Sequence, residues 1–212
     1  LRVVHRTTFT YEGKAHDSFN EVRLRPFDDA TQECREFHLR LTPGTTPRDY
    51  ADFYGNTVHY FDVIASHPKL TIEAESMIDT VPTSARPTVP RLSLEELTAS
   101  PEYELLADFC ASSHYVPLEV ELWREAQDAL AEGRSDLWND VCRMGEHIHR
   151  RFAYRPNTTG VNTLATDVLK LRMGVCQDFA HLHLGLCRSL GIPARYVSGY
   201  FFNTTRRPRE IE

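Results

Sequence analysis

The stretch that decides the fold is residues 174–193, which read GVCQDFAHLHLGLCRSLGIP. Apolar residues recur along it at helical spacing, with further apolar residues beside that stripe, so it predicts a helix buried in a core. The helix is expected to begin at or near Cys176, two residues after Gly174. It should end near Leu190, because Gly191 suits a left-handed cap and Pro193 forbids continuation.

A cysteine at the start of a helix is a candidate nucleophile. The unpaired backbone N–H groups at a helix start favour negative charge, which stabilises a thiolate. The same groups can hold the oxyanion of an acyl-transfer step. On position alone, however, a small buried cysteine is the more common case. The assignment of Cys176 therefore depends on the sequence that surrounds it.

The first eighty residues have the pattern of β structure. Polar and apolar residues alternate in short runs, as in Leu39 and Leu41, which flank a charged residue. Turn signals separate these runs, and Gly55-Asn56 marks a hairpin turn between two of them. Short strands separated by turns favour a small antiparallel β-sandwich, which we expect over residues 1–80.

Residues 81–99 are expected to link this sandwich to a second domain. Three prolines fix φ and remove backbone donors there, namely Pro82, Pro87 and Pro90. From residue 100 onward the apolar spacing becomes helical, so the second domain is expected to cover residues 100–212. Helices are expected from Ser100-Pro101, over residues 118–132, after Ser135, and from a Thr163 cap to Leu171.

The composition argues against several classes of function. The net charge is -6, with acidic and basic residues interspersed, so neither a nucleic-acid nor a membrane partner is expected. No apolar run approaches the ~20 residues that cross a bilayer, and no targeting leader is recognised, so we expect a cytoplasmic protein. The five cysteines are scattered and include no CxxC pair, so no disulfide framework, metal site or other cofactor is expected.

Residues 174–182 resemble the active-site helix of bacterial transglutaminase-like proteins, and the resemblance continues through residues 188–200. Upstream, residues 152–156 followed by Thr158 look like the approach to that family's cysteine. The first eighty residues are similar to the β-rich region that commonly precedes this core. The supporting pieces there are His5, residues 20–26 and residues 52–56.

This resemblance implies an α+β protein, with an N-terminal antiparallel β-sandwich followed by a papain-like transglutaminase core. It also implies a Cys-His-Asp triad, in which a thiolate attacks a peptide or glutamine carbonyl and forms a thioester. Water then gives hydrolysis, and an amine gives cross-linking. Cys176 maps onto the nucleophile. The triad His and Asp do not map, because the family's His lies on the strand after the one expected at residues 195–202. Both are expected beyond residue 212, so the core should be incomplete and inactive over these residues.

The other polar residues near Cys176 have less specific interpretations. His181 is rotated away from Cys176 on the helix, and His183 lies roughly 10 Å along its axis, so neither is expected to act as the base. Asp178 is expected to contribute favourable charge near the helix start. Tyr154 either lines the cleft or is structural. The run at residues 206–209 is expected to be a solvated basic loop.

Two classes of function remain open. The first is a thiol hydrolase or acyltransferase acting on protein or peptide substrates through Cys176. The alternative is a non-catalytic binding or scaffolding protein that keeps the fold. A His and Asp downstream would favour the first class, since a thiolate without a base and an orienting acid loses most of its power. The substrate, the choice between hydrolysis and cross-linking, and the oligomeric state stay undecided.

Overall fold

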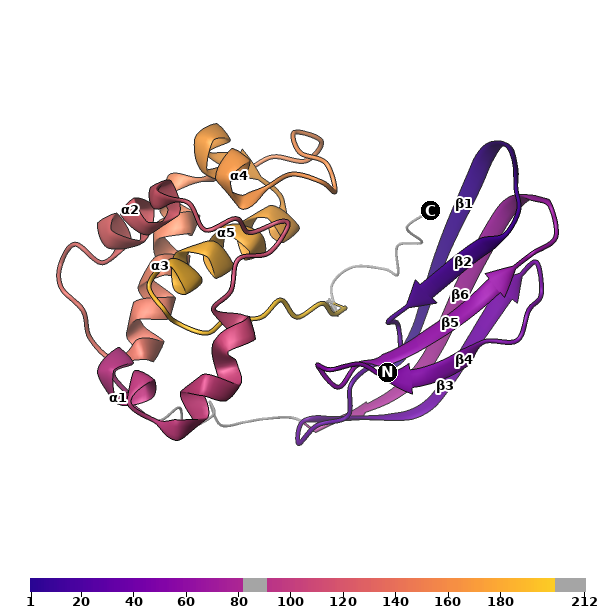
Figure 1. Cartoon of the computed structure of the whole chain (residues 1–212), viewed down its shortest axis with the longest axis horizontal. Coiled ribbons are helices and arrows are strands. Elements are labelled where there is room, and N and C mark those ends of the chain that lie inside the picture. Colours follow the sequence, from indigo (N-terminus) through magenta and orange to yellow (C-terminus); the bar gives the residue numbers. More distant parts are fainter. Residues whose placement is uncertain (82–90, 201–212) are drawn as a thin grey trace. The chain divides into compact units, whose positions relative to one another are not determined.

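The structure, a computed structural model, describes residues 1–81 and 91–200 (Figure 1). These residues form two compact units. One contains the strands of residues 1–81 together with Gly199 and Tyr200, and the other contains the helices of residues 91–198. Strands come first and helices follow, so the expected α+β class is confirmed.

The first unit contains six strands in two antiparallel three-stranded sheets, in the orders β1-β6-β3 and β2-β5-β4. β6 is central to its sheet because it pairs along most of its length with both β1 and β3. The strands are β1 (Arg2–Ala15), β2 (Ser18–Val22), β3 (Gln32–Thr42), β4 (Arg48–Ala51), β5 (Thr57–Val63) and β6 (His67–Thr80).

The hairpin turn expected at Gly55-Asn56 is confirmed between β4 and β5. Gly55 has a φ of 80°, a conformation that side-chain-bearing residues rarely adopt. The Asp52 carboxylate accepts hydrogen bonds from the Tyr54 and Asn56 backbone N–H groups and from the Asn56 side chain. The Asn56 side chain is the largest influence that lowers the pKa of Asp52 to about 2. The turn is therefore held by its own side chains.

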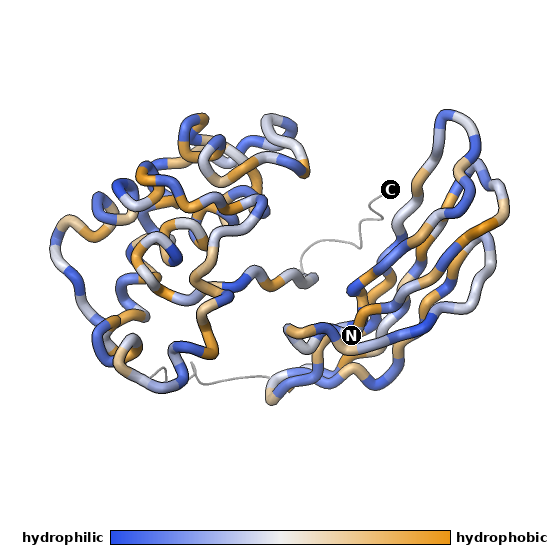
Figure 2. The backbone as a smooth tube through the Cα atoms, in the orientation of Figure 1, coloured by the Kyte–Doolittle hydropathy of each residue, from blue (hydrophilic) through white to orange (hydrophobic). Residues whose placement is uncertain are grey.

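Side chains from both sheets meet in one apolar cluster, as expected of alternating strands with one inward face. Figure 2 shows the corresponding alternation of hydrophobic and hydrophilic segments along the chain. The buried members of the apolar cluster are Phe61, Val63, Leu70 and Ile72. Five partly buried residues pack against them, namely Tyr11, Val22, Leu24, Leu39 and Leu41.

The second unit contains helices and one short parallel pair of strands. In chain order they are α1 (Leu94–Thr98), the 3₁₀ helix η1 (Pro101–Phe109), α2 (Val120–Ala129), α3 (Leu137–Arg151), β7 (Ala153–Tyr154), α4 (Ala165–Leu171), β8 (Met173–Gly174) and α5 (Cys176–Ser189). β7 pairs with β8. Gly191, two residues after α5, has a φ of 79°, so the predicted start and end of this helix are confirmed.

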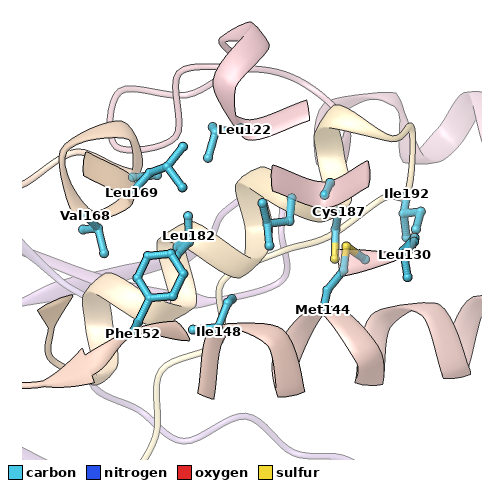
Figure 3. Close-up of a cluster of buried hydrophobic side chains, with 13 residues drawn as sticks. Leu122, Leu130, Met144, Ile148, Phe152, Val168, Leu169, Leu182, Cys187 and Ile192 are labelled. Atoms are coloured by element: carbon cyan, nitrogen blue, oxygen red, sulfur yellow. The ribbon is translucent and has the colours of Figure 1, made fainter. Parts of the chain in front are cut away.

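Helix α5 contacts α2, α3 and α4, so it lies at the centre of the helical unit. Leu182 and Leu186 are fully buried in the main apolar cluster. Figure 3 shows this cluster around α5. Its other members include Leu122 and Leu130 from α2 and its end, Met144 and Ile148 from α3, and Val168 and Leu169 from α4. The prediction of a core helix is confirmed.

Several local predictions were wrong. Part of the predicted linker is helical, because Ser93 and Glu96 form a reciprocal capping box that starts α1. The prolines Pro82, Pro87 and Pro90 lie outside the described residues. Thr163 does not cap α4, since its hydroxyl accepts a hydrogen bond from the Gly160 N–H instead.

The prediction of a strand at residues 195–202 is wrong for residues 195–200, the part that the structure describes. Residues 195–200 are irregular, and among the described residues no strand of the helical unit pairs with them. A strand requires a neighbouring strand for its backbone hydrogen bonds, which an extended sequence cannot supply alone. Residues 201 and 202 lie outside the described residues, as does the basic run at 206–209.

Candidate active site

Two short strands position the start of α5. The Ala153 N–H donates to the Arg172 carbonyl and the Arg155 N–H donates to the Gly174 carbonyl, each at 2.9 Å. These bonds continue the β7–β8 pairing on both sides of the strands. The chain then turns directly from Gly174 into α5, whose first residue is Cys176. The cysteine is thus set by a strand pair on one side and a core helix on the other.

Cys176 differs from the other cysteines in its exposure. All five are described and have free thiols, and only Cys176 is exposed. Cys34 and Cys187 are buried, and burial raises the pKa of Cys187 to about 12, so its thiol is inert near neutral pH. Cys110 and Cys142 are half-buried. The position and the exposure of Cys176 both suit a nucleophile.

Asp178 lies two residues after Cys176 and is 1% exposed. Its Oδ2 accepts a hydrogen bond from the Val175 N–H at 2.7 Å and one from the Thr159 hydroxyl at 2.6 Å. The bond from Val175 satisfies a donor that a helix start leaves unpaired. The expectation that Asp178 stabilises the helix start through its charge therefore has a specific geometry. Its link to Thr159 could not be read from the sequence.

The loop of residues 155–163 borders the start of α5. The Gln177 side chain donates to the Val161 carbonyl at 3.5 Å, next to Cys176 in the chain. Within the loop, the Thr158 hydroxyl donates to the Arg155 carbonyl at 2.8 Å. The side chain of Val161 is 75% exposed. The exposed Val161 side chain thus belongs to a loop that contacts Gln177, the residue after Cys176.

Tyr154 also lies beside this region. Tyr154 pairs with Gly174 between β7 and β8, and its side chain is 63% exposed. The Tyr154 ring meets the Phe179 ring edge-on, with centroids 6.4 Å apart. Tyr154 therefore has both of the properties considered for it, a packing contact and an exposed surface.

The histidines of α5 point into other surroundings. The His181 ring stacks on Tyr115 at a centroid distance of 5.3 Å and is tilted against Tyr196 on another side. His183 hydrogen-bonds to the Val141 carbonyl at 3.0 Å. Burial lowers the pKa of both histidines, which favours the neutral ring. Within residues 1–81 and 91–200, no side chain hydrogen-bonds to the Cys176 sulfur.

An ion network forms around the buried carboxylate of Glu125 and includes Arg172, the residue that precedes β8. The Arg172 guanidinium donates two hydrogen bonds to the Glu125 carboxylate, and His147 hydrogen-bonds to the same carboxylate at 2.7 Å. Burial acts to raise the pKa of Glu125, but the bonds from Arg172 and His147 outweigh it and leave that pKa below its usual value. The Arg172 guanidinium also lies 4.8 Å from the centroid of the Phe152 ring. The only sequence signal for this network is a glutamate on the apolar side of α2.

Other site types find little support in the described residues. A cavity of about 340 Å³ lies between α2 and α4 and is lined mainly by charged residues, including Glu125 and Arg172. It does not include Cys176. Among the described residues, no three His, Cys, Asp or Glu side chains come close enough to hold a metal ion. No described helix has the length and apolarity to cross a membrane.

Comparison with known families decides the assignment. Residues 1–79 match the family described as the bacterial transglutaminase-like N-terminal region, and residues 124–209 match the transglutaminase-like superfamily. An uncharacterized protein of Mycobacterium leprae is 36% identical over 205 residues, which cover 94% of this chain and 70% of that protein. The chain belongs to the transglutaminase-like superfamily.

Other relatives are consistent with this membership. Uncharacterized proteins of Mycobacterium bovis and Mycobacterium tuberculosis are 31% identical over 203 residues. These residues cover 94% of this chain but only 65% of each relative, so the chain spans slightly less than two thirds of their length. The crystal structure of a putative cysteine protease from Cytophaga hutchinsonii superimposes with a TM-score of 0.68 at 18% identity, covering 91% of this chain and 67% of that one. It shows that the fold is shared.

The family resemblance inferred from the sequence is therefore confirmed. At the level of the family, membership of this superfamily supports a thiol-dependent enzyme. The assignment of Cys176 as its nucleophile stays a prediction, although the cysteine lies inside the matched core region. The contact of Thr159 with Asp178 and the network around Glu125 were missed, since each depends on contacts between distant segments.

Proposed function

We propose that this transglutaminase-like protein is a thiol hydrolase or acyltransferase that acts on amide bonds of peptides or proteins through Cys176. The observation that carries the proposal is the place of Cys176, the exposed thiol at the first residue of a buried helix. The core packing of α5 holds the helix start in one orientation. The helix start favours a thiolate and offers backbone N–H groups to an oxyanion.

The proposed reaction has two halves. The thiolate sulfur attacks the amide carbonyl carbon, a C–S bond forms, and the carbonyl oxygen becomes an oxyanion at the N–H groups of the α5 start. The oxyanion collapses, the C–N bond breaks, and the departing amine receives a proton from the triad His. Water or an amine then attacks the thioester carbon and gives its proton to the same His. The C–S bond breaks, the acid or the new amide is released, and the thiolate is regenerated.

The triad His and Asp of this mechanism are part of the proposal. On the family resemblance, we expect both beyond residue 212. No cofactor is required, since the nucleophile, the base and the oxyanion donors are all protein groups. A cytoplasmic location, where thiols stay reduced, also belongs to the proposal.

One observation favours a second candidate, a binding or scaffolding protein that keeps the fold without turnover. In the described part of the chain, no histidine hydrogen-bonds to the Cys176 sulfur. A thiol without a base and an orienting acid loses most of its catalytic power. The two candidates differ in one measurable property, the reactivity of the Cys176 thiol.

Limited alkylation tests the proposal. The purified protein is treated with a limiting dose of iodoacetamide at pH 6, and the product is measured by intact mass and peptide mapping. Rapid single labelling at Cys176 is expected, and Cys176→Ser should abolish it. Slow labelling shared with Cys110 and Cys142 would contradict the nucleophile and favour the scaffolding role. Labelled protein should also lose any ammonia release from glutamine peptides and any peptide cleavage.

A further inference from the structure

Asp178 is a charged residue in a place where an apolar one would pack at lower cost. It is 1% exposed, and in the described part of the chain it makes no ion pair. A carboxylate removed from water requires compensation by hydrogen bonds or charges. Here the compensation comes from the Val175 N–H and the Thr159 hydroxyl, both on Oδ2. Each of these two donors belongs to a segment that borders Cys176.

The first donor fixes the backbone immediately before the nucleophile. Because the Val175 N–H is bound to Asp178, the turn from β8 into α5 has one orientation. The same turn requires a glycine at position 174, because a Cβ there would lie 2.8 Å from both Cβ and Oδ2 of Asp178. The Asp178 side chain therefore packs against the backbone of Gly174, and only a glycine leaves room for it there. The direction of the Cys176 side chain follows from this turn.

The second donor fixes the loop of residues 155–163. Thr159 lies 19 residues before Asp178, at the middle of that loop, and its hydroxyl reaches the buried carboxylate. Two residues later, the Val161 carbonyl accepts the Gln177 side chain at 3.5 Å. The loop is thus tied to the first turn of α5 at two points, Gln177 and Asp178, the two residues that follow Cys176 in the chain.

We infer that Asp178 and Thr159 form a clasp that positions Cys176 against the loop of residues 155–163, so that this loop is one wall of the acyl-donor site. The inference rests on the proposed function. Asp178 and Thr159 are positioning residues, which act through Val175 and the loop and do not touch the substrate. Val161 gives the wall an exposed apolar side chain, which favours acyl donors with an apolar group beside the reacting carbonyl.

Four variants separate positioning from general stability. Thr159→Val removes the hydroxyl with little change of shape, and Thr98→Val is its control outside the loop, since the Thr98 hydroxyl donates to the Glu95 carbonyl in α1. Asp178→Asn keeps an oxygen acceptor but removes the charge. Asp178→Ala removes both.

The first readout is the rate constant for alkylation of Cys176 by iodoacetamide between pH 5 and pH 9. The second is the ratio of this rate constant to the one for N-benzyl-iodoacetamide. Thermal unfolding is measured in parallel. Thr159→Val should slow alkylation of Cys176 by about tenfold and change the ratio between the two reagents, because both thiol and wall lose their fixed positions. Thr98→Val should stay within about twofold of the unaltered protein. Alkylation of Cys176 should slow less in Asp178→Asn, which keeps an acceptor, than in Asp178→Ala, where it should slow at least as much as in Thr159→Val.

The outcomes that overturn the clasp are distinct from those that overturn the proposed function. If Cys176 of the unaltered protein reacts no faster than Cys110, the proposed function fails, and the clasp fails with it. If Cys176 is reactive but folded Thr159→Val and Thr98→Val behave alike in rate and ratio, the clasp alone fails. A loss in Asp178→Asn as large as in Asp178→Ala would also overturn it, since charge and not hydrogen bonding would then matter. Where Asp178→Ala does not fold, the two threonine variants decide.

Discussion

Helices α2 and α5 pack together where Leu122 lies against Gly185. A Cβ built on Gly185 would lie 2.9 Å from Cδ1 and 3.3 Å from Cδ2 of Leu122, a fully buried side chain. The absence of a side chain at Gly185 therefore makes room for Leu122. This contact helps to hold in the core the helix that begins at Cys176.

Gly185→Ala should destabilise the protein by about 1–3 kcal/mol, because the added methyl overpacks the core. Gly145→Ala is the matched control on α3, where a Cβ would meet the His183 ring at an ordinary 3.4 Å. That variant should gain about 0.5–1 kcal/mol from helix propensity. Urea unfolding of both measures the difference. Stabilisation by both substitutions would show that Leu122 moves aside without cost.

Gly174→Ala should lower stability by about 1–3 kcal/mol, since its Cβ would overlap the Asp178 side chain. Gly160→Ala is the control, because nothing lies within 4 Å of a Cβ there. Its effect should remain within about 0.5 kcal/mol. The shift of the unfolding midpoint in urea distinguishes the two. Equal midpoints would mean that the turn before Cys176 relaxes freely around a side chain.

Glu125→Gln should cost about 1–3 kcal/mol at pH 7, because it removes the charge that Arg172 and His147 bind. The pKa of Glu125 is lower in the folded than in the unfolded protein, so its stabilisation is present above about pH 4.3 and is lost as pH falls through the folded value. The difference in unfolding free energy between the two proteins should therefore shrink below pH 4.

The exposed pair of Glu146 and Arg150 on α3 supplies the control for that measurement. Glu146→Gln should change stability by only about 0–1 kcal/mol, since solvent screens the pair. Chemical unfolding from pH 3 to pH 7 measures both variants. A pH profile of Glu125→Gln parallel to that of the unaltered protein would contradict the role assigned to the buried carboxylate.

His181→Phe should weaken the pH dependence of stability between about pH 5 and pH 6.5 while it keeps the stacking on Tyr115. Burial lowers the pKa of His181, opposed by Asp178 and assisted by Arg188, so the unfolded chain binds the proton more readily. Its stabilisation is full above about pH 6.5 and declines as pH falls through the folded value. Thermal unfolding at several pH values checks this. His183 contributes in the same direction, so the slope should decrease without vanishing.

Helix α5 could be predicted from the sequence because its signals are local. The apolar stripe, Gly191 and Pro193 lie within one short stretch. The stripe has the spacing of a helix, and the two residues after it end the helix through their own backbone. The same holds for the β4–β5 hairpin at Gly55. The candidate role of Cys176 required the family resemblance as well, since a cysteine at a helix start is common in cores.

The remaining features depend on segments that meet only in the folded chain. Asp178 and Thr159 are 19 residues apart, and Glu125 and Arg172 are 47 apart, so no periodicity connects them. The strand expected at residues 195–202 was wrong in its described part for a related reason. A strand depends on its neighbours, whereas a helix forms its hydrogen bonds within itself.

The network around Glu125 also has a dynamic consequence. Its three members come from α2, from α3 and from the residue that ends α4, so the approach to β8 cannot open without breaking contacts to both of the other helices. Segments coupled in this way open together. The backbone amides around Met173 and Gly174 should therefore exchange with solvent deuterium at the slow rate of the helical core. In a surface loop, the same backbone amides would exchange faster.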